Sequence, residues 1–218
     1  MSDNSQIKTK QRVVDHGEVF TSEREVNAML DLVEQETVRI DSRFLEPACG
    51  NGNFLIEVLR RKMAVVEERY CKNQLEYERN AIIAIGSIYG VDLLEDNVIH
   101  CRNRLKSCFD ENYSRLFKSE CREECRYSVD YVLSRNVIWG DALTLNRVDG
   151  SKEPIVFSEW SPVNGSMIKR RDYSLAHLLV YQPMDGPNLF SDLGDEAFIP
   201  KPVAEFPLTH YLRLPDHD

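Results

Sequence analysis

The pattern of apolar and polar residues first becomes regular near Ser22, where it predicts a helix. Ser22 and Glu25 have the spacing of a capping box, in which each side chain accepts a hydrogen bond from a backbone amide of the first turn. Apolar residues then recur at helical intervals, at Val26, Met29, Leu30 and Val33. We therefore predict that a helix begins at Ser22 and buries this face, and that the polar residues 1–12 are flexible.

Short apolar segments after this helix have the length and the flanking residues of buried strands. The pattern predicts four strands, over residues 42–48, 87–92, 135–145 and 153–160. The second is predicted to end at Asp92, and the third to turn at Gly140 and Asp141. No later sheet strand is recognisable, so we predict a sheet that is truncated after the fourth strand.

Helical patterns occupy the intervals between these strands. Residues 53–85 read as a helix in one piece or two, and a charged, helix-prone insertion covers residues 110–134. The helix that follows the second strand has its apolar positions at Val98, Cys101 and Leu105. Strands that alternate with helices predict an α/β fold, with a doubly wound, mostly parallel sheet and helices on both of its faces.

The sequence changes character after Gly165. Residues 167–179 are compatible with one helix, and the residues beyond them contain several prolines and little periodicity. We predict an irregular extension that packs on the domain or on a partner, rather than further sheet. The predicted organisation is a flexible N-terminus at residues 1–12, one α/β domain at residues 13–165 and a C-terminal extension at residues 166–218.

The composition fits one domain and narrows the cellular location and the binding partners that we expect. A chain of 218 residues with 42% hydrophobic content is long enough for one buried core and too short for two ordinary domains. No apolar run spans a bilayer and no secretory signal precedes the domain, so we expect a cytoplasmic protein without membrane contact. A net charge of −9 argues against unaided tight binding to a polyanion, so contacts with nucleic acid are expected to be local or shared.

The six cysteines have no disulfide-framework spacing. In a cytoplasmic chain they read most simply as reduced thiols. Cys121 and Cys125 lie one helical turn apart, which leaves open a metal site completed by Cys101 or Cys108. The short Cys-x-x-Cys pair that is common in such sites is missing, so ordinary thiols are favoured and no metal site is predicted.

The glycine turn after the first predicted strand, in FLEPACGNGNFL, carries the strongest chemical signal. At this place in a doubly wound sheet, Gly50 and Gly52 let the backbone approach a ligand and aim helix amides at it. No third glycine follows and Glu46 precedes the turn, so a nicotinamide dehydrogenase is the weaker interpretation. An acid here suits a ligand with positive charge, such as the amino group and sulfonium of S-adenosylmethionine, better than a pyrophosphate.

Two further acids end the next predicted strands. Asp92 is placed to accept hydrogen bonds from ribose hydroxyls, and Asp141 to accept from the exocyclic amine of an adenine. Each feature alone is common, because glycine turns begin many helices and acids after strands often serve as N-caps. Their order and spacing together predict a site for a nucleoside joined to an amino acid, and hence S-adenosylmethionine as the cofactor.

Four successive motifs resemble the cofactor-site motifs of the N6-adenine DNA methyltransferases of bacterial restriction-modification systems: HGEVFTS, FLEPACGNGNFL, IYGVDLLEDNV and NVIWGDAL. The resemblance covers roughly residues 13–160 and implies a Rossmann-like methyltransferase fold that acts on DNA. It implies that Asp92 holds the ribose, that Asp141 holds the adenine amine and that Glu46 contacts the methionine part. It also implies cofactor contacts from Gly17, Phe20, Thr21, Pro47, Gly50 and Gly52.

Members of that family follow the fourth strand with Asn, Asp or Ser, then two prolines and an aromatic residue. The side-chain oxygen and a backbone carbonyl accept from the target amine, and the ring stacks on the flipped base. Here Ser161 and Pro162 match the first two positions, while the second proline and the aromatic residue have no counterpart. We therefore predict Ser161 and Pro162 as the catalytic residues, with Glu159 or Trp160 as a further group at the amine. Trp160 would be the stacking aromatic residue only in a different register.

Two functions of different class remain open. The first is an S-adenosylmethionine-dependent adenine-N6 DNA methyltransferase, or the modification subunit of a restriction-modification system, with a partner that recognises DNA. A partner is expected because no stretch is long enough for a target-recognition domain. Lys169, Arg170 and Arg171 are candidates for phosphate contacts, with a solvated helix start as the other interpretation. The second function is a catalytically inactive subunit, cofactor-binding or structural, that acts through a protein partner.

Overall fold

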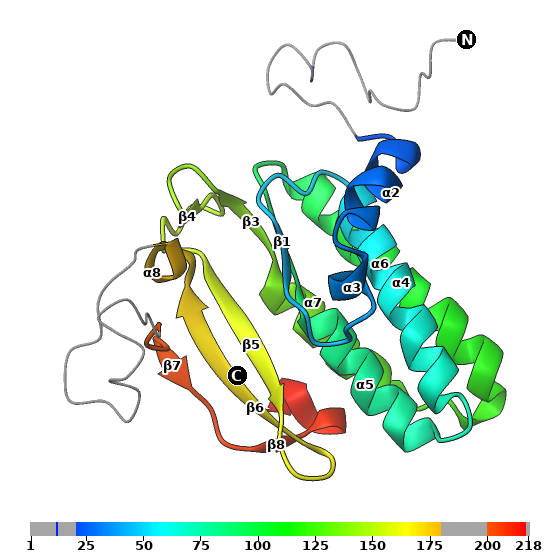
Figure 1. Ribbon diagram of the computed structural model, residues 1–218. Coiled ribbons are helices and arrows are strands. Elements are labelled where there is room, and N and C mark those ends of the chain that lie inside the picture. The colour runs from blue at the N-terminus through cyan, green and yellow to red at the C-terminus, as the bar shows by residue number, and fades with distance from the viewer. Residues whose placement is uncertain (1–11, 13–20, 180–199, 217–218) are drawn as a thin grey trace, which may run out of the picture.

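A mixed sheet of four strands lies at the centre of the α/β fold (Figure 1). The computed structural model describes residue 12 and residues 21–179 and 200–216. Strands β1 (Phe44–Glu46), β2 (Ile88–Asp92) and β3 (Val137–Asp141) run parallel, and β4 (Asn146–Arg147) pairs antiparallel with β3. The strand order is β1-β2-β3-β4, which leaves β1 at one edge. The α/β class and the first three predicted strands are confirmed.

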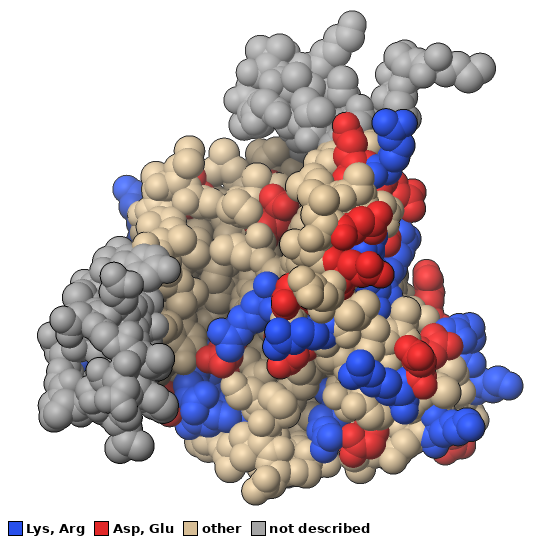
Figure 2. All heavy atoms as spheres, in the orientation of Figure 1, with Lys and Arg blue, Asp and Glu red and all other residues tan. Residues whose placement is uncertain are grey.

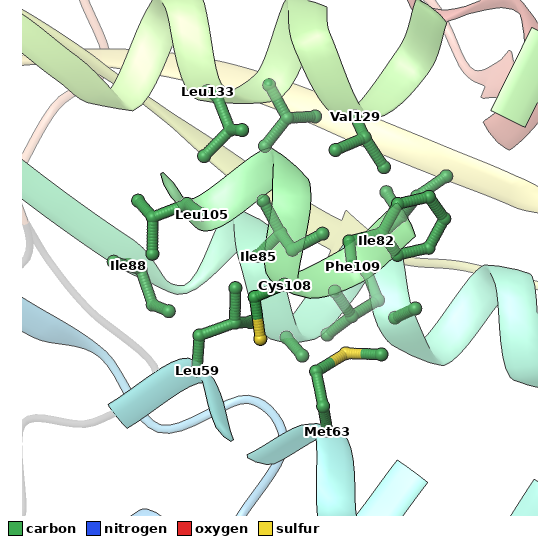
Figure 3. Packing of buried hydrophobic residues seen from close by; sticks show 14 of the residues in the cluster. Leu59, Met63, Ile82, Ile85, Ile88, Leu105, Cys108, Phe109, Val129 and Leu133 are labelled. Carbon is green, nitrogen blue, oxygen red and sulfur yellow. The ribbon is translucent and has the colours of Figure 1, made fainter. Parts of the chain in front are cut away.

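Four long helices cover one face of this sheet. They are α4 (Asn53–Tyr70), α5 (Gln74–Gly86), α6 (Glu95–Phe117) and α7 (Glu123–Asn136), and the short 3₁₀ segment η2 (Lys118–Glu120) joins the last two. The helical pattern over residues 53–85 therefore divides into two helices, and the charged insertion is helical as predicted. Figure 3 shows apolar side chains from all four helices meeting Ile88 of β2 in the main core. Burial of these side chains stabilises the helical layer.

The N-terminal helix α2 (Glu23–Asp31) begins as predicted, and the short helix α3 (Glu34–Thr37) follows it. The Ser22 side chain accepts from the Glu25 amide, and the Glu25 carboxylate accepts from the Ser22 amide at 3.0 Å. Val26 and Leu30 are buried, whereas Met29 and Val33 are exposed. The predicted buried face is therefore correct only in part, because Val33 falls in the break between α2 and α3, where the helical period is lost.

A second, antiparallel sheet replaces the predicted fourth parallel strand. Strand β5 (Val156–Pro162) pairs along its whole length with β6 (Met167–Ser174). Strands β7 (Ala204–Glu205) and β8 (Thr209–His210) both add to β6. The helix predicted over residues 167–179 is wrong: only α8 (Leu175–Leu179) is helical. The expectation that the tail adds no sheet is also wrong, and the boundary predicted at residue 165 falls in the turn between paired strands.

The second sheet covers the face of the parallel strands that the helices leave open (Figure 1). Tyr89, Val91 and Ile138 point to this face and pack against residues of the second sheet and its flanks: Ile155, Phe157 and Leu175. Alternate residues of a strand face opposite sides, so β2 contributes Ile88 to the helical core and Tyr89 to this smaller core. The prediction of helices on both faces is therefore wrong.

An internal ion pair explains why β6 escaped recognition as a strand. Burial alternates along β6, and its inward side chains include Arg170 and Asp172. The two side chains pair at 2.7 Å, and the Arg170 guanidinium lies 3.8 Å from the centroid of the Phe206 ring. Because the ion pair and the ring offset the cost of burial, a strand with two charged residues on its inner face can form here.

The basic cluster of Lys169, Arg170 and Arg171 is therefore neither a helix start nor an unpaired cationic surface. Arg170 is buried, and Lys169 and Arg171 lie 3.1 and 3.9 Å from the carboxylate of Glu205 on β7. Figure 2 likewise shows basic and acidic side chains interspersed on the face that it presents. A phosphate could contact this cluster only by replacing the carboxylates with which its basic side chains already pair.

The C-terminal residues dock on the helical layer through a buried polar network. The 3₁₀ segment η4 (Tyr211–Asp216) packs on α7, and the Tyr211 hydroxyl donates to the fully buried carboxylate of Glu78 at 2.7 Å. Glu78 also accepts from the Tyr113 hydroxyl and from the Gln74 amide. The extension thus packs on the domain, as predicted, and supplies one of the donors that satisfy this carboxylate.

Tyr211→Phe removes only the hydroxyl that donates to Glu78. Because hydrogen bonds to buried charged groups contribute more than neutral ones, we expect the free energy of unfolding to fall by about 1.5–3 kcal/mol. Urea denaturation followed by circular dichroism measures the change. Tyr127→Phe, at an exposed tyrosine, is the matched control and is expected to change the value by less than about 0.5 kcal/mol. Equal effects of the two substitutions would contradict this role for Tyr211.

Candidate functional site

A cavity of about 530 Å³ opens at the carboxyl ends of the parallel strands. The acids that end the three strands, Glu46, Asp92 and Asp141, all line it. Ligands of open α/β sheets bind at this edge, since the loops after successive parallel strands meet there. Three of the predicted site acids, which are far apart in the sequence, are therefore brought together.

The glycine turn lies between β1 and α4, and Gly50 lines the cavity whereas Gly52 does not. Gly50 and Gly52 adopt positive φ angles of 51° and 87°, a region that disfavours residues with a Cβ atom. A Cβ atom at Gly52 would also lie 2.7 Å from the sulfur of Cys101 on α6. Gly52 is thus required both by the backbone conformation and by the close approach of α6.

The Asp92 carboxylate fixes the glycine turn. It accepts hydrogen bonds from the amides of Gly50 at 2.8 Å and Leu94 at 2.9 Å, and from the Asn97 side chain at 3.2 Å. A carboxylate has about four acceptor positions, so three donors leave roughly one position for a ligand. Asp92 is therefore first a structural acceptor that joins the turn, β2 and the start of α6.

Two residues of α6 that the sequence analysis missed also build the site. Asn97 lines the cavity and donates to Asp92, and Arg104 donates to the backbone oxygen of Asn51 at 2.8 Å and to the Asn53 side chain at 2.7 Å. Asn97, Cys101 and Arg104 follow one another at helical spacing on the face toward the turn. This spacing is the sequence signal by which the two residues could have been found. It was missed because the apolar residues of the same helix indicate a buried core helix and draw attention away from its polar face.

The local environment shifts the pKa values of two of the acids in opposite directions. Burial raises the pKa of Glu46 above its ordinary value of 4.5, although a hydrogen bond from the Ala48 amide acts against the shift. The Leu143 amide, at 2.9 Å, lowers the pKa of Asp141, and the Thr144 hydroxyl adds to this effect. Glu46 is thus the acid whose charge is least satisfied by the protein itself.

The N-terminus of α4 points toward the same cavity. Gly52 is the N-cap residue, no side chain caps the helix, and no acidic residue lies in the first turn. The first amides of a helix have no partner within it, and the helix dipole favours negative charge at this end. Asn53 and Phe54, the first two residues of α4, line the cavity. The cavity therefore offers an anion-binding end beside a group of carboxylates.

Ser161 and Pro162 are not brought to this cavity. Both line a separate pocket of about 110 Å³ that also includes Arg43 and Ser87, the residues just before β1 and β2. The reason is the direction of β5, which starts near the carboxyl ends of the parallel strands, where the Ile155 amide donates to Leu145, and runs toward their amino ends. A parallel fourth strand would have ended at the cavity instead.

The two further candidates for the amine, Glu159 and Trp160, also lie outside the strand-end cavity. Glu159 forms an ion pair with Arg43, and the indole of Trp160 is buried and donates to Asn136 at 3.4 Å. Among the other predicted contacts, Thr21 and Pro47 line the strand-end cavity, whereas Gly17 and Phe20 lie outside the described residues.

The described residues contain no group of three or more His, Cys, Asp or Glu side chains arranged to hold a metal ion. The six cysteines are free, and no described helix is both long enough and apolar enough to cross a membrane. Comparisons with protein-family models, with curated proteins and with solved structures give no match to this chain.

Gly52→Ala is expected to destabilise the turn through both the backbone angle and the contact with Cys101. Gly150→Ala is the matched control, because Gly150 has a similar φ of 91° and a Cβ atom added there would have no neighbouring atom within 4 Å. We expect the free energy of unfolding to fall by about 1–3 kcal/mol more for Gly52→Ala than for Gly150→Ala. Cys101→Ala in the Gly52→Ala background should recover part of the loss. Chemical denaturation measures all four proteins, and equal losses at the two glycines would exclude the contact as a cause.

Proposed function

We propose that this chain binds S-adenosylmethionine in the strand-end cavity and is the modification subunit of an adenine-N6 DNA methyltransferase. The convergence of Glu46, Asp92 and Asp141 on one cavity beside the glycine turn carries the proposal. These acids belong to the motifs that resemble the restriction-modification methyltransferases, and a Rossmann-like methyltransferase fold is part of the same proposal.

The charges around the cavity fit the charges of S-adenosylmethionine. Its sulfonium and ammonium groups are cationic and suit the Glu46 carboxylate, while its own carboxylate suits the uncapped N-terminus of α4. A dinucleotide pyrophosphate would bring two negative charges toward three carboxylates, which is unfavourable. The carboxylates and the helix N-terminus around the cavity therefore support a ligand that carries both positive and negative groups over a polyanionic ligand.

The polar and apolar residues that line the cavity suit different parts of S-adenosylmethionine. The remaining acceptor position of Asp92 suits a ribose hydroxyl, and Asp141 suits the exocyclic amine of the adenine. Leu93 and Leu143 line the cavity between these acids and are 49% and 94% exposed, so a planar base that covers them would remove apolar surface from water. The Trp139 indole donates to the backbone oxygen of Leu93 at 3.0 Å and helps to fix its position.

Bound S-adenosylmethionine supplies an electrophilic methyl group in such an enzyme. The target amine is a poor nucleophile because its lone pair is delocalised into the ring. Polar acceptors would therefore have to hold its protons while nitrogen bonds to the methyl carbon, the carbon–sulfur bond breaks and one amine proton is released. Ser161 and Pro162, the predicted acceptors, line a different pocket. We therefore propose that a partner chain provides these acceptors and the contacts that recognise DNA.

A second function is supported by the same observation that Ser161 and Pro162 lie outside the strand-end cavity. The chain would then be an inactive subunit that binds the cofactor and regulates or stabilises a partner protein. The two functions share the cavity and differ in whether the complete complex transfers a methyl group.

Titration calorimetry with S-adenosylmethionine tests the shared step. We expect a dissociation constant in the micromolar range, corresponding to about −8 kcal/mol, and an affinity about tenfold weaker for Glu46→Gln. Because burial raises the pKa of Glu46, this carboxylate takes up a proton at a higher pH than an ordinary glutamate, so binding of the cationic cofactor should weaken as the pH is lowered. Glu46→Gln should lose this part of the pH dependence, and Glu68→Gln, an exposed acid on α4, should retain it. Absence of binding in a folded sample would refute the cofactor site.

Methyl transfer separates the two functions. The chain, co-expressed with the proteins encoded beside it, is mixed with methyl-labelled cofactor and unmodified duplex DNA. The first function predicts labelled N6-methyladenine that disappears with Asp141→Asn and persists with Ser161→Ala, because Ser161 lies outside the cavity. Cofactor binding without transfer in every combination would favour the inactive subunit. Loss of transfer in Ser161→Ala with binding intact would contradict the assignment of the acceptors to a partner.

A further inference from the structure

We infer that the edge of β1 opposite β2, which no described strand pairs, is the docking site for a β-strand of a partner protein chain. The partner strand runs parallel to β1 and ends at the strand-end cavity. The inference rests on the proposed function, since it locates the partner that would complete the methyl-transfer site. It adds the position, the direction and the chemistry of the contact.

The backbone of β1 presents a hydrogen-bonding edge. The Phe44 amide donates to Ser87 at 2.9 Å, which directs the polar backbone groups of Phe44 toward β2. Successive residues of a strand direct these groups to opposite sides, so the N–H and C=O of Leu45 point away from β2. β1 is the last strand in the sheet order, and no described strand pairs with this edge. An edge of this kind is a template for an added strand.

A groove beside this edge can receive the side chains of such a strand. Its volume is about 320 Å³, and Leu45, Tyr89, Phe157 and Tyr173 form much of its lining. Leu45 is 43% exposed, and the ion pair between Arg43 and Glu159 lies at the same groove. Because alternate side chains of an added strand would face the groove, we expect apolar residues at every second position of the partner strand.

The direction follows from the position of Glu46. Arg43 and Leu45 line the groove, while Glu46, the last residue of β1, and Pro47, which follows it, line the strand-end cavity. A strand parallel to β1 would have its carboxyl end beside Glu46 and place the residues that follow it at the cavity. Acceptors for the target amine, which Ser161 and Pro162 do not supply there, can enter the site in this way.

A protein strand fits these features better than nucleic acid does. The edge offers the N–H donor and the C=O acceptor of Leu45, the groove is largely apolar, and the adjoining cavity is lined by three carboxylates. Among the described lining residues, Arg43 is the cation at the groove, and its guanidinium is already paired with Glu159, so phosphates would have to displace that carboxylate. DNA is therefore expected to contact the completed complex rather than this edge.

Two substitutions at Leu45 test the docking site without disturbing the pairing with β2. Leu45→Pro removes the outward amide, which an edge strand tolerates, and Leu45→Lys places a charge in the groove. Leu32→Lys, at an exposed leucine that follows α2, is the matched control. Each protein encoded beside this chain is co-expressed with the tagged chain, and the complex is measured by size exclusion and titration. We expect one of them to bind, with at least tenfold weaker binding for both Leu45 variants and unchanged binding for Leu32→Lys.

Hydrogen exchange identifies the occupant of the edge. The Leu45 amide should exchange rapidly in the isolated chain and at least tenfold more slowly in the complex, while the Phe44 amide changes little. Rapid exchange in the complex, equal binding by all variants, or failure of every neighbouring protein to bind would overturn the inference. A further outcome would overturn the inference: the Leu45 amide is protected in the isolated chain, and replacing residues 180–199 by a Gly-Ser linker removes that protection. This result would mean that the chain covers the edge itself.

Cofactor titration on the same proteins separates this inference from the proposed function. The Leu45 variants should bind S-adenosylmethionine as the unaltered chain does, because Leu45 is not part of the cavity lining. A complex that depends on Leu45 in a chain that binds no cofactor would refute the proposed function and keep the docking site. Cofactor binding and methyl transfer without dependence on Leu45 would refute the docking site and keep the function.

Discussion

The candidate site depends on one carboxylate that accepts hydrogen bonds from three donors in two other segments of the chain. Asp92 ends β2, and its oxygens accept from the turn after β1 and from two residues at the start of α6. The side chain is only 9% exposed, so its charge is stabilised by these donors rather than by bulk water. Charge-assisted hydrogen bonds of this kind hold a glycine turn whose residues otherwise have wide conformational freedom. The shape of the cavity therefore follows from the pairing of Asp92.

The two faces of the parallel sheet are covered by different chemistry. The face covered by helices is packed mainly with apolar side chains, and the Glu78 hydrogen-bond network lies within the helical layer. The opposite face is covered by the second sheet, which contains the ion pair between Arg170 and Asp172. Arg170 and Asp172 make the second sheet possible, since neither charge could be buried alone at acceptable cost. They also bind it to α7, because Arg135 lies 3.3 Å from Asp172 and the Tyr131 hydroxyl accepts from Arg170.

Local signals in the sequence were sufficient to predict that three strand-end acids lie at one cavity. Glu46, Asp92 and Asp141 each follow a short apolar segment, and the rule that parallel strands end at one edge brings them together without further information. Ser161 and Pro162 lie away from this cavity because β5 is not a further parallel strand. Its direction is set by pairing with β6, whose inward residues, Arg170 and Asp172, resemble a solvated surface until their partners are known. One of those partners, Phe206, is distant in the sequence, so no local pattern could reveal the strand.

The docking of Tyr211 on Glu78 also constrains when the fold can be completed during synthesis. The two residues are 133 positions apart in the chain. At about 5–20 residues per second, a ribosome needs roughly 7–27 s to extend the chain from one to the other. During that time the Glu78 carboxylate lacks one of its native donors, and the surface of α7 that η4 covers stays open to water or to a chaperone. The helical layer can therefore form early, but the native set of donors to its buried Glu78 carboxylate is completed only after Tyr211 has been synthesised.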